Sequence, residues 1–183
     1  LYGGNGNDIL NGGNGGDILQ GGNGRDRVDY VHASSGVVAD LGYAHLGTGQ
    51  AQGDRYGSIE DLAGSNAHDS LRGDSGANTI WGRGGNDWLV SRGGNDTIHG
   101  GSGSDTFVFS SGRDKITDFK AQEDALRFDV SLWTPSFHTA QSFFDTYAQV
   151  GAKSTVFDFG NRDALELTGF YDPAALVDSM VLV

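Results

Sequence analysis

Residues 82–90 read GRGGNDWLV, and residues 91–99 read SRGGNDTIH. Both stretches carry glycines in the first half, an aspartate at the sixth position and an apolar residue at the eighth. The same pattern begins at Gly3 as GGNGNDILN, runs to residue 29 and returns over residues 64–108. Degenerate copies at 55–63 and 109–117 extend the second array. A repeat of fixed period determines the architecture of the whole chain, so this period is the primary fold signal.

Each position of the repeat has a physical role. Glycines adopt positive φ, so a six-residue turn can direct its carbonyl oxygens inward. Three strand residues follow, and the middle one points inward because side chains alternate along a strand. We expect two repeats to form one coil, with strands stacked in parallel on two facing sheets. The inward residues are Leu62, Ile80, Ile98 and Ile116 on one sheet and Leu71, Leu89 and Phe107 on the other, and the first array offers Leu10, Leu19 and Val28.

Composition excludes several classes of protein and points to cations. The 183 residues include 24 acidic and 12 basic side chains, a formal charge of −12, which argues against nucleic acid as a partner. One apolar residue in nine is a thin core against an ordering cost of about 1–2 kcal/mol per residue. There is no cysteine, and no apolar run approaches the roughly 20 residues of a membrane span. We therefore expect bound cations to supply the missing stabilisation.

The repeats resemble a known family. GGNGNDILN and its copies look like the RTX repeat, a calcium-binding parallel β-roll. The segment DKITDFKAQEDALRFD (114–129) is similar to the one that closes the roll in secreted proteases, lipases and mannuronan epimerases. Residues 30–63 resemble the irregular segment that interrupts many RTX arrays. The resemblance implies a mainly β fold, a right-handed parallel β-roll of nonapeptide repeats with a C-terminal α/β cap of a helix plus a hairpin.

The same resemblance implies the domain organisation. Residues 1–117 would form the calcium-binding roll, with repeats at 1–29 and 55–117 and an irregular insertion at 30–54. Residues 118–183 would form the cap. Leu1 falls nine residues before Leu10, so we expect the chain to begin inside a repeat of a longer protein.

The resemblance also implies several calcium ions and their ligands. Calcium takes six to eight oxygen ligands, and in the family one ion lies between a turn and the turn two repeats later. The earlier turn gives the carbonyls of positions two and four with its aspartate, and the later turn gives the carbonyls of positions one and three with its own. The implied ligands in the first array are Gly4, Gly6, Asp8, Gly13, Gly15, Asp17, Gly21, Asn23 and Asp26. Those in the second array are Ser65, Ala67, Asp69, Gly82, Arg83, Gly84, Gly85, Asp87, Arg92, Gly93, Gly94, Asp96, Gly100, Gly101, Ser102, Gly103, Asp105, Phe109, Ser111 and Asp114, with Asp118 and Asp124 completing the last turn.

Three departures from the pattern bear on these sites. Asn78 stands where the sixth-position aspartate is expected, so its sites with Glu60 and Asp96 lose charge. Ser91 and Arg92 replace the glycine pair, although only their carbonyls would be needed. Asp17 has no partner 18 residues later, and whether its ion exists depends on how the insertion folds.

No enzyme is predicted from this sequence. The histidines form no HExxH pair, and GxSxG is absent, so zinc-protease and nucleophile-elbow chemistry have no residues to carry them. The paired acids are already explained as metal ligands. Trp81 and Trp88 fall at outward positions of different sheets, which favours surface packing over a shared sugar platform.

The chain after residue 117 looks globular. Residues 136–151 place Phe137, Ala140, Phe144 and Tyr147 at helical spacing, and residues 154–160 and 164–170 alternate around a turn, as in a hairpin. A cap over the open end of the roll is expected because repeat arrays need capping. We expect it to bury Leu126, Phe128, Phe144 and Phe157. The final VDSMVLV is similar to the C-terminal export signal of type I secreted RTX proteins, and a last β-strand would look the same.

The sequence thus predicts a calcium-dependent folding and type I secretion module of a larger extracellular protein. Its expected partners are the type I secretion machinery and an upstream catalytic or adhesive domain of the same chain, with no nucleic acid and no stable membrane insertion. Two alternatives remain open. One is a module that binds an anionic polysaccharide such as alginate through Arg25, Arg27, Arg55, Arg72, Arg83 and Arg92. The other is a calcium-dependent surface adhesin or self-assembling layer protein.

Overall fold

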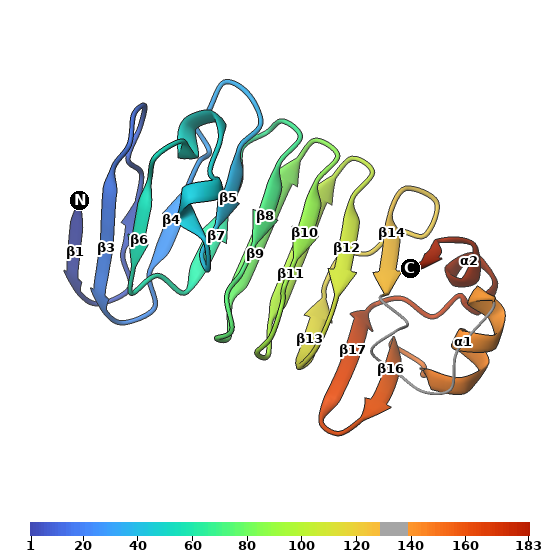
Figure 1. Ribbon diagram of the computed structural model, residues 1–183. Coiled ribbons are helices and arrows are strands. Elements are labelled where there is room, and N and C mark those ends of the chain that lie inside the picture. The colour runs from blue at the N-terminus through green and yellow to red at the C-terminus, as the bar shows by residue number, and fades with distance from the viewer. Residues whose placement is uncertain (129–138) are drawn as a thin grey trace.

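The computed structural model describes residues 1–128 and 139–183. Its short strands stack in coils from the N-terminus to a C-terminal cap (Figure 1). The strands before the cap are β1 (Tyr2–Asn5), β2 (Ile9–Leu10), β3 (Ile18–Asn23), β4 (Arg27–Asp29), β5 (Val38–Asp40), β6 (Arg55–Gly57), β7 (Asp61–Ala63), β8 (Ser70–Arg72), β9 (Thr79–Gly84), β10 (Trp88–Val90), β11 (Thr97–Ser102), β12 (Thr106–Phe109) and β13 (Arg113–Ile116).

Pairing between strands follows the repeat. The long sheet runs β15 (Ala148–Val150)-β16 (Ser154–Gly160)-β17 (Asp163–Thr168)-β13-β11-β9-β7-β4-β2. The facing sheet runs β18 (Met180–Leu182)-β14 (Ala125–Phe128)-β12-β10-β8-β5. A short sheet, β1-β3-β6, joins two strands of the first array to β6. Leu89 pairs in parallel with Leu71 and Phe107, two repeats away on either side. The expected parallel β-roll, with two repeats per coil, is confirmed.

The core is the row of eighth-position side chains. Leu62, Ile80 and Leu89 are completely buried. The neighbouring rungs carry the remaining predicted inward residues, all of them buried: Leu10, Leu19, Val28, Leu71, Ile98, Phe107 and Ile116. Because each rung contributes one such side chain, the interior of the roll is about one apolar layer per sheet.

The insertion divides one side of the roll and leaves the other continuous. Strand β6 pairs with β3 of the first array, whereas β5 pairs with β8 of the second. On the opposite side β4 pairs directly with β7, so the long sheet crosses the insertion without a break. Two short 3-10 turns, η1 (Ala44–Leu46) and η2 (Gly49–Ala51), lie between β5 and β6.

The cap continues both sheets. Its strands are β14 (Ala125–Phe128), β15 (Ala148–Val150), β16 (Ser154–Gly160), β17 (Asp163–Thr168) and β18 (Met180–Leu182), and its helices are α1 (Ala140–Tyr147) and α2 (Pro173–Asp178). β14 extends the facing sheet from β12, and β17 extends the long sheet from β13. The helix α1, the β16–β17 hairpin and the helix α2 gather at the C-terminal end of the roll (Figure 1).

Side chains of the cap close the end of the core. Leu126, Phe128, Phe144 and Phe157 are buried as expected, at 9% exposure or less. Phe109 of the last coil stacks on Phe159 of the hairpin, with ring centroids 5.0 Å apart. The predicted helix is confirmed from Ala140 to Tyr147, and Phe137 lies outside the described residues. None of the described helices is long and apolar enough to cross a membrane.

Candidate metal centre

The turns before the strands have the backbone shape that the repeat predicts. Most glycines at positions two and four have positive φ, for example 104° at Gly101 and 121° at Gly103. A side chain is strained in this left-handed region, which explains the glycine preference there. Arg83 (φ 79°) and Arg92 (φ 71°) adopt the same conformation in place of glycine.

A ladder of amides and carboxylates connects each turn to the turn two repeats later. The amide of Asp69 donates to Oδ1 of Asp87 at 2.8 Å, and the amide of Asp87 donates to Oδ1 of Asp105 at 2.9 Å. The amide of Asp105 donates in turn to Oδ1 of Asp124 at 3.0 Å. This row lies at the start of the strands of the facing sheet.

The other turn edge, before the strands of the long sheet, carries an equivalent ladder. Asp8 donates to Oδ1 of Asp26 at 2.7 Å, and Asp96 donates to Oδ1 of Asp114 at 3.1 Å. The structure therefore brings together the aspartate pairs predicted from the spacing of 18 residues.

The second carboxylate oxygens point to a cation. Five turn aspartates have a buried Oδ2 atom with no hydrogen-bond partner among the described residues: Asp8, Asp17, Asp26, Asp87 and Asp96. Burial of an unpaired ionised oxygen costs several kcal/mol, and such groups are normally paired or coordinate a metal. A Cβ placed on Gly3 would lie 2.6 Å from Oδ2 of Asp8 and 2.8 Å from the carbonyl oxygen of Gly21.

A Cβ on Gly82 would likewise meet Oδ2 of Asp87 and, at 2.5 Å, the carbonyl of Gly100. An aspartate oxygen of one turn and a first-position carbonyl of the later turn thus converge beside a glycine that leaves the space free. Within residues 1–128 and 139–183, no group of three or more carboxylates and histidines gathers to hold a metal. Carbonyl oxygens must therefore supply most ligands, and hard oxygens of this kind fit calcium.

Burial raises the pKa of several of these aspartates. Burial raises the pKa of Asp87 to about 7, and the carboxylates of Asp69 and Asp105 add to the rise. Burial also raises the pKa of Asp69, Asp96, Asp105, Asp114 and Asp124. A raised pKa means that the folded chain disfavours the ionised form, so negative charge along the ladders opposes folding unless a cation offsets it.

Asp17 finds its partner inside the insertion. Strand β6 pairs with β3 so that Arg55 lies opposite Ile18, which places Asp54 opposite Asp17. Oδ1 of Asp54 accepts the amide of Asp17 at 2.9 Å, as in the regular ladder. Oδ2 of Asp54 accepts the hydroxyl of the buried Tyr30 at 2.8 Å. The sequence prediction missed Asp54, although Asp54-Arg55-Tyr56 repeats the aspartate and the eighth-position bulky residue.

The neighbouring rung of the same edge has no carboxylate. Val38 of β5 pairs with Ser70, so Val37 lies opposite Asp69, and its amide donates to Oδ1 of Asp69 at 2.7 Å. Asp69 also accepts from the amide and the hydroxyl of Ser65, so neither of its oxygens is free of donors.

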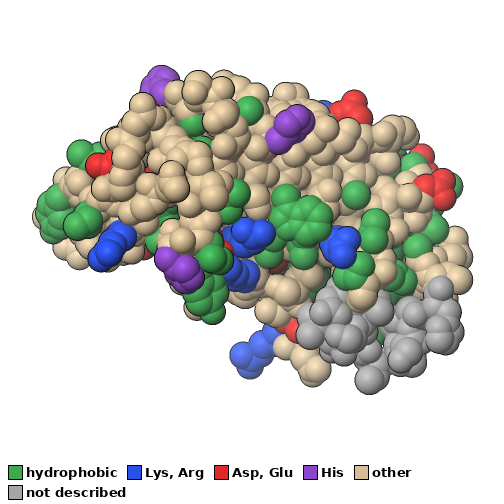
Figure 2. Space-filling model, turned by 45° about the horizontal axis from the view of Figure 1, so that its top comes forward, with side chains coloured by type: hydrophobic (Ala, Val, Ile, Leu, Met, Phe, Trp, Pro, Cys, Tyr) green, Lys and Arg blue, Asp and Glu red, His purple; other side chains and the backbone are tan. Residues whose placement is uncertain are grey.

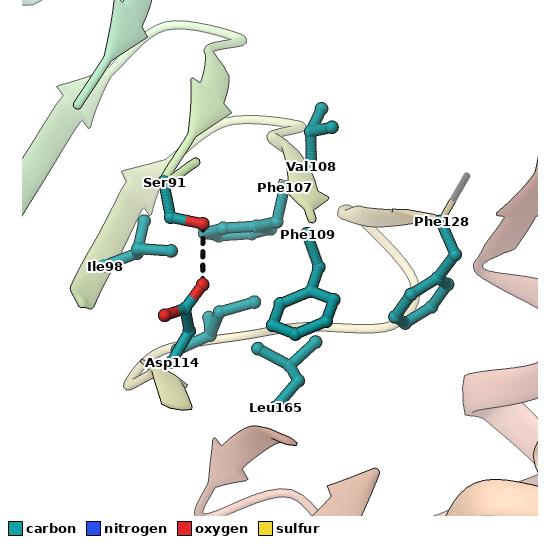
Figure 3. A pocket seen from close by; sticks show the side chains of 9 residues that line it. Ser91, Ile98, Phe107, Val108, Phe109, Asp114, Phe128 and Leu165 are labelled. Atoms are coloured by element: carbon teal, nitrogen blue, oxygen red, sulfur yellow. Dashed lines mark hydrogen bonds between the residues drawn. The ribbon is translucent and has the colours of Figure 1, made fainter. Parts of the chain in front are cut away.

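Where the repeat departs from the pattern, two side chains form hydrogen bonds at the turns. The hydroxyl of Ser91 donates to Oδ2 of Asp114 at 2.6 Å, next to the apolar end of the core formed with Phe109 and Leu165 (Figure 3). Asn78 donates through Nδ2 to the carbonyl of Glu60 at 2.8 Å. For Ser91 the sequence prediction considered the carbonyl alone, whereas Asn78 stands at a turn whose sites were expected to lose charge.

The last turn is completed by the cap. Oδ1 and Oδ2 of Asp118 accept the amides of Gly100 and Gly101, and Asp124 stands at the sixth position opposite Asp105. The ammonium of Lys120 donates to the carbonyl of Gly101 at 3.2 Å, so a protein cation already contacts one implied ligand.

Most of the arginines considered for uronate binding form ion pairs with aspartates of the same chain. Arg25 pairs with Asp61, Arg83 with Asp29 and Arg92 with Asp40, each at 2.6–2.7 Å. Arg27 contacts Asp29 at 3.3 Å and lies over the ring of Trp81. Acidic side chains are sparse on the face drawn in Figure 2, where basic and hydrophobic ones are interspersed.

Trp81 and Trp88 lie on different sheets, as expected. Trp81 in β9 stacks on His99 with centroids 5.6 Å apart, and Trp88 opens β10 under the guanidinium of Arg127. They do not form one platform.

Comparison with known proteins agrees with this geometry. A family model described as RTX calcium-binding nonapeptide repeat, with four copies, matches residues 1–30, 63–98 and 83–116. The chain is similar to the solution structure of the AlgE6R3 subunit from the Azotobacter vinelandii mannuronan C5-epimerase, at 25% identity and a TM-score of 0.50, over 67% of this chain and 77% of that one.

It is also similar to the extracellular lipase LipA from Serratia marcescens, at 21% identity and a TM-score of 0.41. That match covers 97% of this chain and 38% of the lipase. No curated protein matches the sequence.

Proposed function

Residues 1–30 and 63–116 are RTX calcium-binding nonapeptide repeats, and from this premise we propose that the chain is a calcium-triggered folding module that accompanies the export of a larger protein. The observation that carries the proposal is the set of buried aspartate Oδ2 atoms that have no hydrogen-bond partner among the described residues. In the folded turns these oxygens have lost water and gained no donor from that part of the chain. Folding is therefore coupled to the arrival of positive charge.

Without cations the turns resist folding. In the ladder the carboxylates of Asp87 and Asp105 each accept the amide of the aspartate two repeats earlier, and the chain as a whole carries a formal charge of −12. The apolar interior adds about one buried side chain per rung, which is too little to offset the backbone entropy of nine residues. Repulsion and a thin core together favour an extended chain.

Calcium, when bound, supplies the positive charge and the coordination that the turn oxygens lack. Extracellular calcium modules have Kd values on the order of 10⁻⁴–10⁻³ M, well above the calcium level inside a cell. A ligand that binds only the folded state stabilises that state by mass action. The chain would remain unfolded before export, pass a narrow channel, and fold outside the cell.

The C-terminal segment supports a link to export. Residues 180–182 form β18, which pairs in parallel with β14 and seats Met180 at 8% exposure. In the calcium-free chain this strand would be released and accessible to a type I secretion machinery. In the folded chain the same residues complete the facing sheet. One segment would therefore serve as the export signal before folding and as the last strand afterwards.

Export can be tested in bacterial cells that express a type I exporter. A reporter is fused before residue 1, and the full chain is compared with a chain that lacks residues 173–183. We expect the full chain to reach the medium in the presence or absence of external calcium, and to become protease-resistant only when calcium is added. Equal export of the shortened chain, or retention of the full chain inside the cells, would contradict the export role.

The polysaccharide alternative has less support. Of the six arginines considered for it, Arg55 and Arg72 remain outside the ion pairs of the described residues, and they lie on β6 and β8, strands of two different sheets. Binding of alginate that persists at saturating calcium would favour it. Calcium-driven oligomers in light scattering would favour the adhesin alternative.

A further inference from the structure

The junction between the two arrays carries an additional set of unsatisfied oxygens. The family match ends at residue 30 and resumes at residue 63, so residues 31–62 have no repeat to assign ligands to them. The carboxylate ladder of the long sheet nevertheless crosses this segment. The amide of Asp26 donates to Oε2 of Glu60 at 2.8 Å, in the way that the amide of Asp8 donates to Asp26 at 2.7 Å.

We propose that Asp26, Glu60 and the carbonyl oxygen of Ser58 form a further calcium site, which joins the first array to the second. Asp26 has an exposed fraction of 0%, and its Oδ2 has no hydrogen-bond partner within residues 1–128 and 139–183. A Cβ on Gly21 would collide with this Oδ2 and with the carbonyl of Ser58. The same pair of atom types surrounds Gly3, where the oxygens belong to Asp8 and Gly21.

The short turn explains why these residue types stand here. Strand β6 ends at Gly57 and β7 begins at Asp61, so three residues replace the six of a regular turn. Ser58 adopts φ 49°, a conformation that a non-glycine residue takes only when its surroundings hold it there. Glutamate is one methylene longer than aspartate, which lets Glu60 reach Asp26 from the shortened turn.

Backbone bonds hold Glu60 on Asp26. The amides of Glu60 and Asp61 donate to the carbonyl of Asp26 at 3.1 and 2.9 Å. With the bond from the amide of Asp26 to Glu60, three contacts fix the two acidic residues side by side. Like charges held together in this way destabilise the fold unless a cation lies between them.

No cationic side chain among the described residues pairs with Asp26 or Glu60. The guanidinium of Arg25, next to Asp26 in the sequence, donates to both carboxylate oxygens of Asp61 at 3.0 and 2.6 Å and to the carbonyl of Ala77 at 3.1 Å. Among the described residues, neither Asp26 nor Glu60 forms an ion pair. The positive charge at the junction is directed to Asp61, and the Asp26–Glu60 pair is left for a bound ion.

This inference rests on the proposed calcium-dependent folding and adds a consequence to it. One ion shared by Asp26 and Glu60 would bind residues of both arrays, so the arrays would fold at the same calcium concentration despite the insertion. Without that ion, β2 and β4 would depend on the other sites of the first array alone.

The test compares Glu60→Gln with Glu166→Gln in the full 183-residue chain, with calcium as the only added ligand. Glutamine keeps an oxygen for the amide of Asp26 and removes the charge. Glu166 is a matched control because it lies on β17, away from the turns, where it forms an ion pair with Lys115 at 3.8 Å and accepts the hydroxyl of Thr168 at 3.4 Å. Native mass spectrometry counts bound ions at saturating calcium, and hydrogen exchange follows each array during a calcium titration.

We expect Glu60→Gln to bind one calcium ion fewer than the parent and the control. Protection of residues 1–30 should require on the order of tenfold more calcium, because affinity follows the charge of the ligands. Protection of residues 63–116 should keep its midpoint. An unchanged ion count with coincident midpoints would overturn the junction site while leaving calcium-triggered folding intact.

Glu60→Asp covers the case in which Glu60→Gln does not fold. It keeps the charge and shortens the side chain, so we expect the full ion count at a raised calcium midpoint. If Glu60→Asp also failed to fold at saturating calcium, Glu60 would be required for its length and hydrogen bond, and its role as a ligand would be refuted. If the parent chain were folded in EDTA, the proposed calcium-triggered folding itself would be contradicted.

Discussion

Replacement of Asp87 by asparagine should change stability in opposite directions with and without calcium. Oδ1 of Asp87 accepts the amide of Asp69 at 2.8 Å, and its own amide donates to Asp105 at 2.9 Å. Its Oδ2 is buried and has no hydrogen-bond partner in the described part of the chain. Asparagine preserves the shape and the acceptor oxygen, so the substitution isolates the charge.

The expected loss of stability in the presence of calcium follows from the position of Asp87. Asp87 contacts the turn before and the turn after, so two sites lose a charged ligand. At a tenfold excess over Kd, each site contributes about 1.4 kcal/mol to folding, and the substitution should cost up to about 3 kcal/mol.

The gain without calcium follows from burial, which raises the pKa of Asp87 from 3.8 to about 7. A group whose pKa is raised on folding stabilises the fold below its unfolded pKa, near 4, and loses that contribution as the pH rises through 7. At about 1.4 kcal/mol per pKa unit, the ionised carboxylate costs the calcium-free fold about 4 kcal/mol at pH 8. Asparagine removes this cost.

Both arms can be measured at pH 8 by far-UV circular dichroism. In the presence of calcium, urea unfolding measures the decrease in the free energy of unfolding. In EDTA, a titration with an excluded osmolyte drives folding, and Asp87→Asn should fold at a lower osmolyte concentration than the parent. Asp145→Asn, an exposed aspartate on α1, is the control and should change neither arm. Equal destabilisation in both arms would mean that Asp87 acts only as a hydrogen-bond acceptor, and the reasoning would be wrong.

Three further outcomes are expected. Asn78→Asp should raise calcium affinity by calorimetry yet destabilise the fold in EDTA, because a carboxylate oxygen replaces the Nδ2 that donates to the carbonyl of Glu60; unchanged affinity would argue against an ion at that turn. Removal of residues 118–183 should raise the calcium midpoint of folding in dichroism, since the last coil loses its cover, and an unchanged midpoint would show the cap to be merely attached. Burial raises the pKa of Tyr56 to about 12 and that of Tyr30 further, so stability from this pair is present below pH 10 and lost above it; phenolate absorbance of Tyr30 should appear only with unfolding, and its appearance in the folded chain would contradict this.

Much of the roll is predictable because its information is local and periodic. The eighth position of each repeat determines which side chain points inward, and Leu89 therefore lies opposite Leu71 and Phe107 as expected. The turn glycines and the spacing of 18 residues likewise predict which aspartates meet. These features need no knowledge of distant parts of the chain.

The insertion was beyond that reasoning because it breaks the period. Asp54 lies 37 residues after Asp17, and Glu60 lies 34 residues after Asp26, yet a carboxylate oxygen of each accepts the amide of the earlier aspartate, as in the regular ladder. The register depends on how β5 and β6 separate to pair with different arrays. No local spacing rule yields that division.

The arginines show a second limit of local reasoning. Arg83 and Arg92 replace turn glycines at positive φ, and their partners Asp29 and Asp40 lie 54 and 52 residues away. From the sequence they were candidates for contact with uronates. In the structure they pair with aspartates that border or lie within the insertion, which accounts for side chains at positions that otherwise require glycine.

The most direct test of the central claim is the far-UV dichroism of the parent chain at low ionic strength in EDTA, in millimolar calcium and in millimolar magnesium. The account predicts little regular structure in EDTA and a β-rich spectrum in calcium. Magnesium should be much less effective, because it requires compact octahedral geometry and releases its waters reluctantly. A chain with the full β-rich spectrum in EDTA would contradict the claim that these buried aspartates make folding depend on calcium.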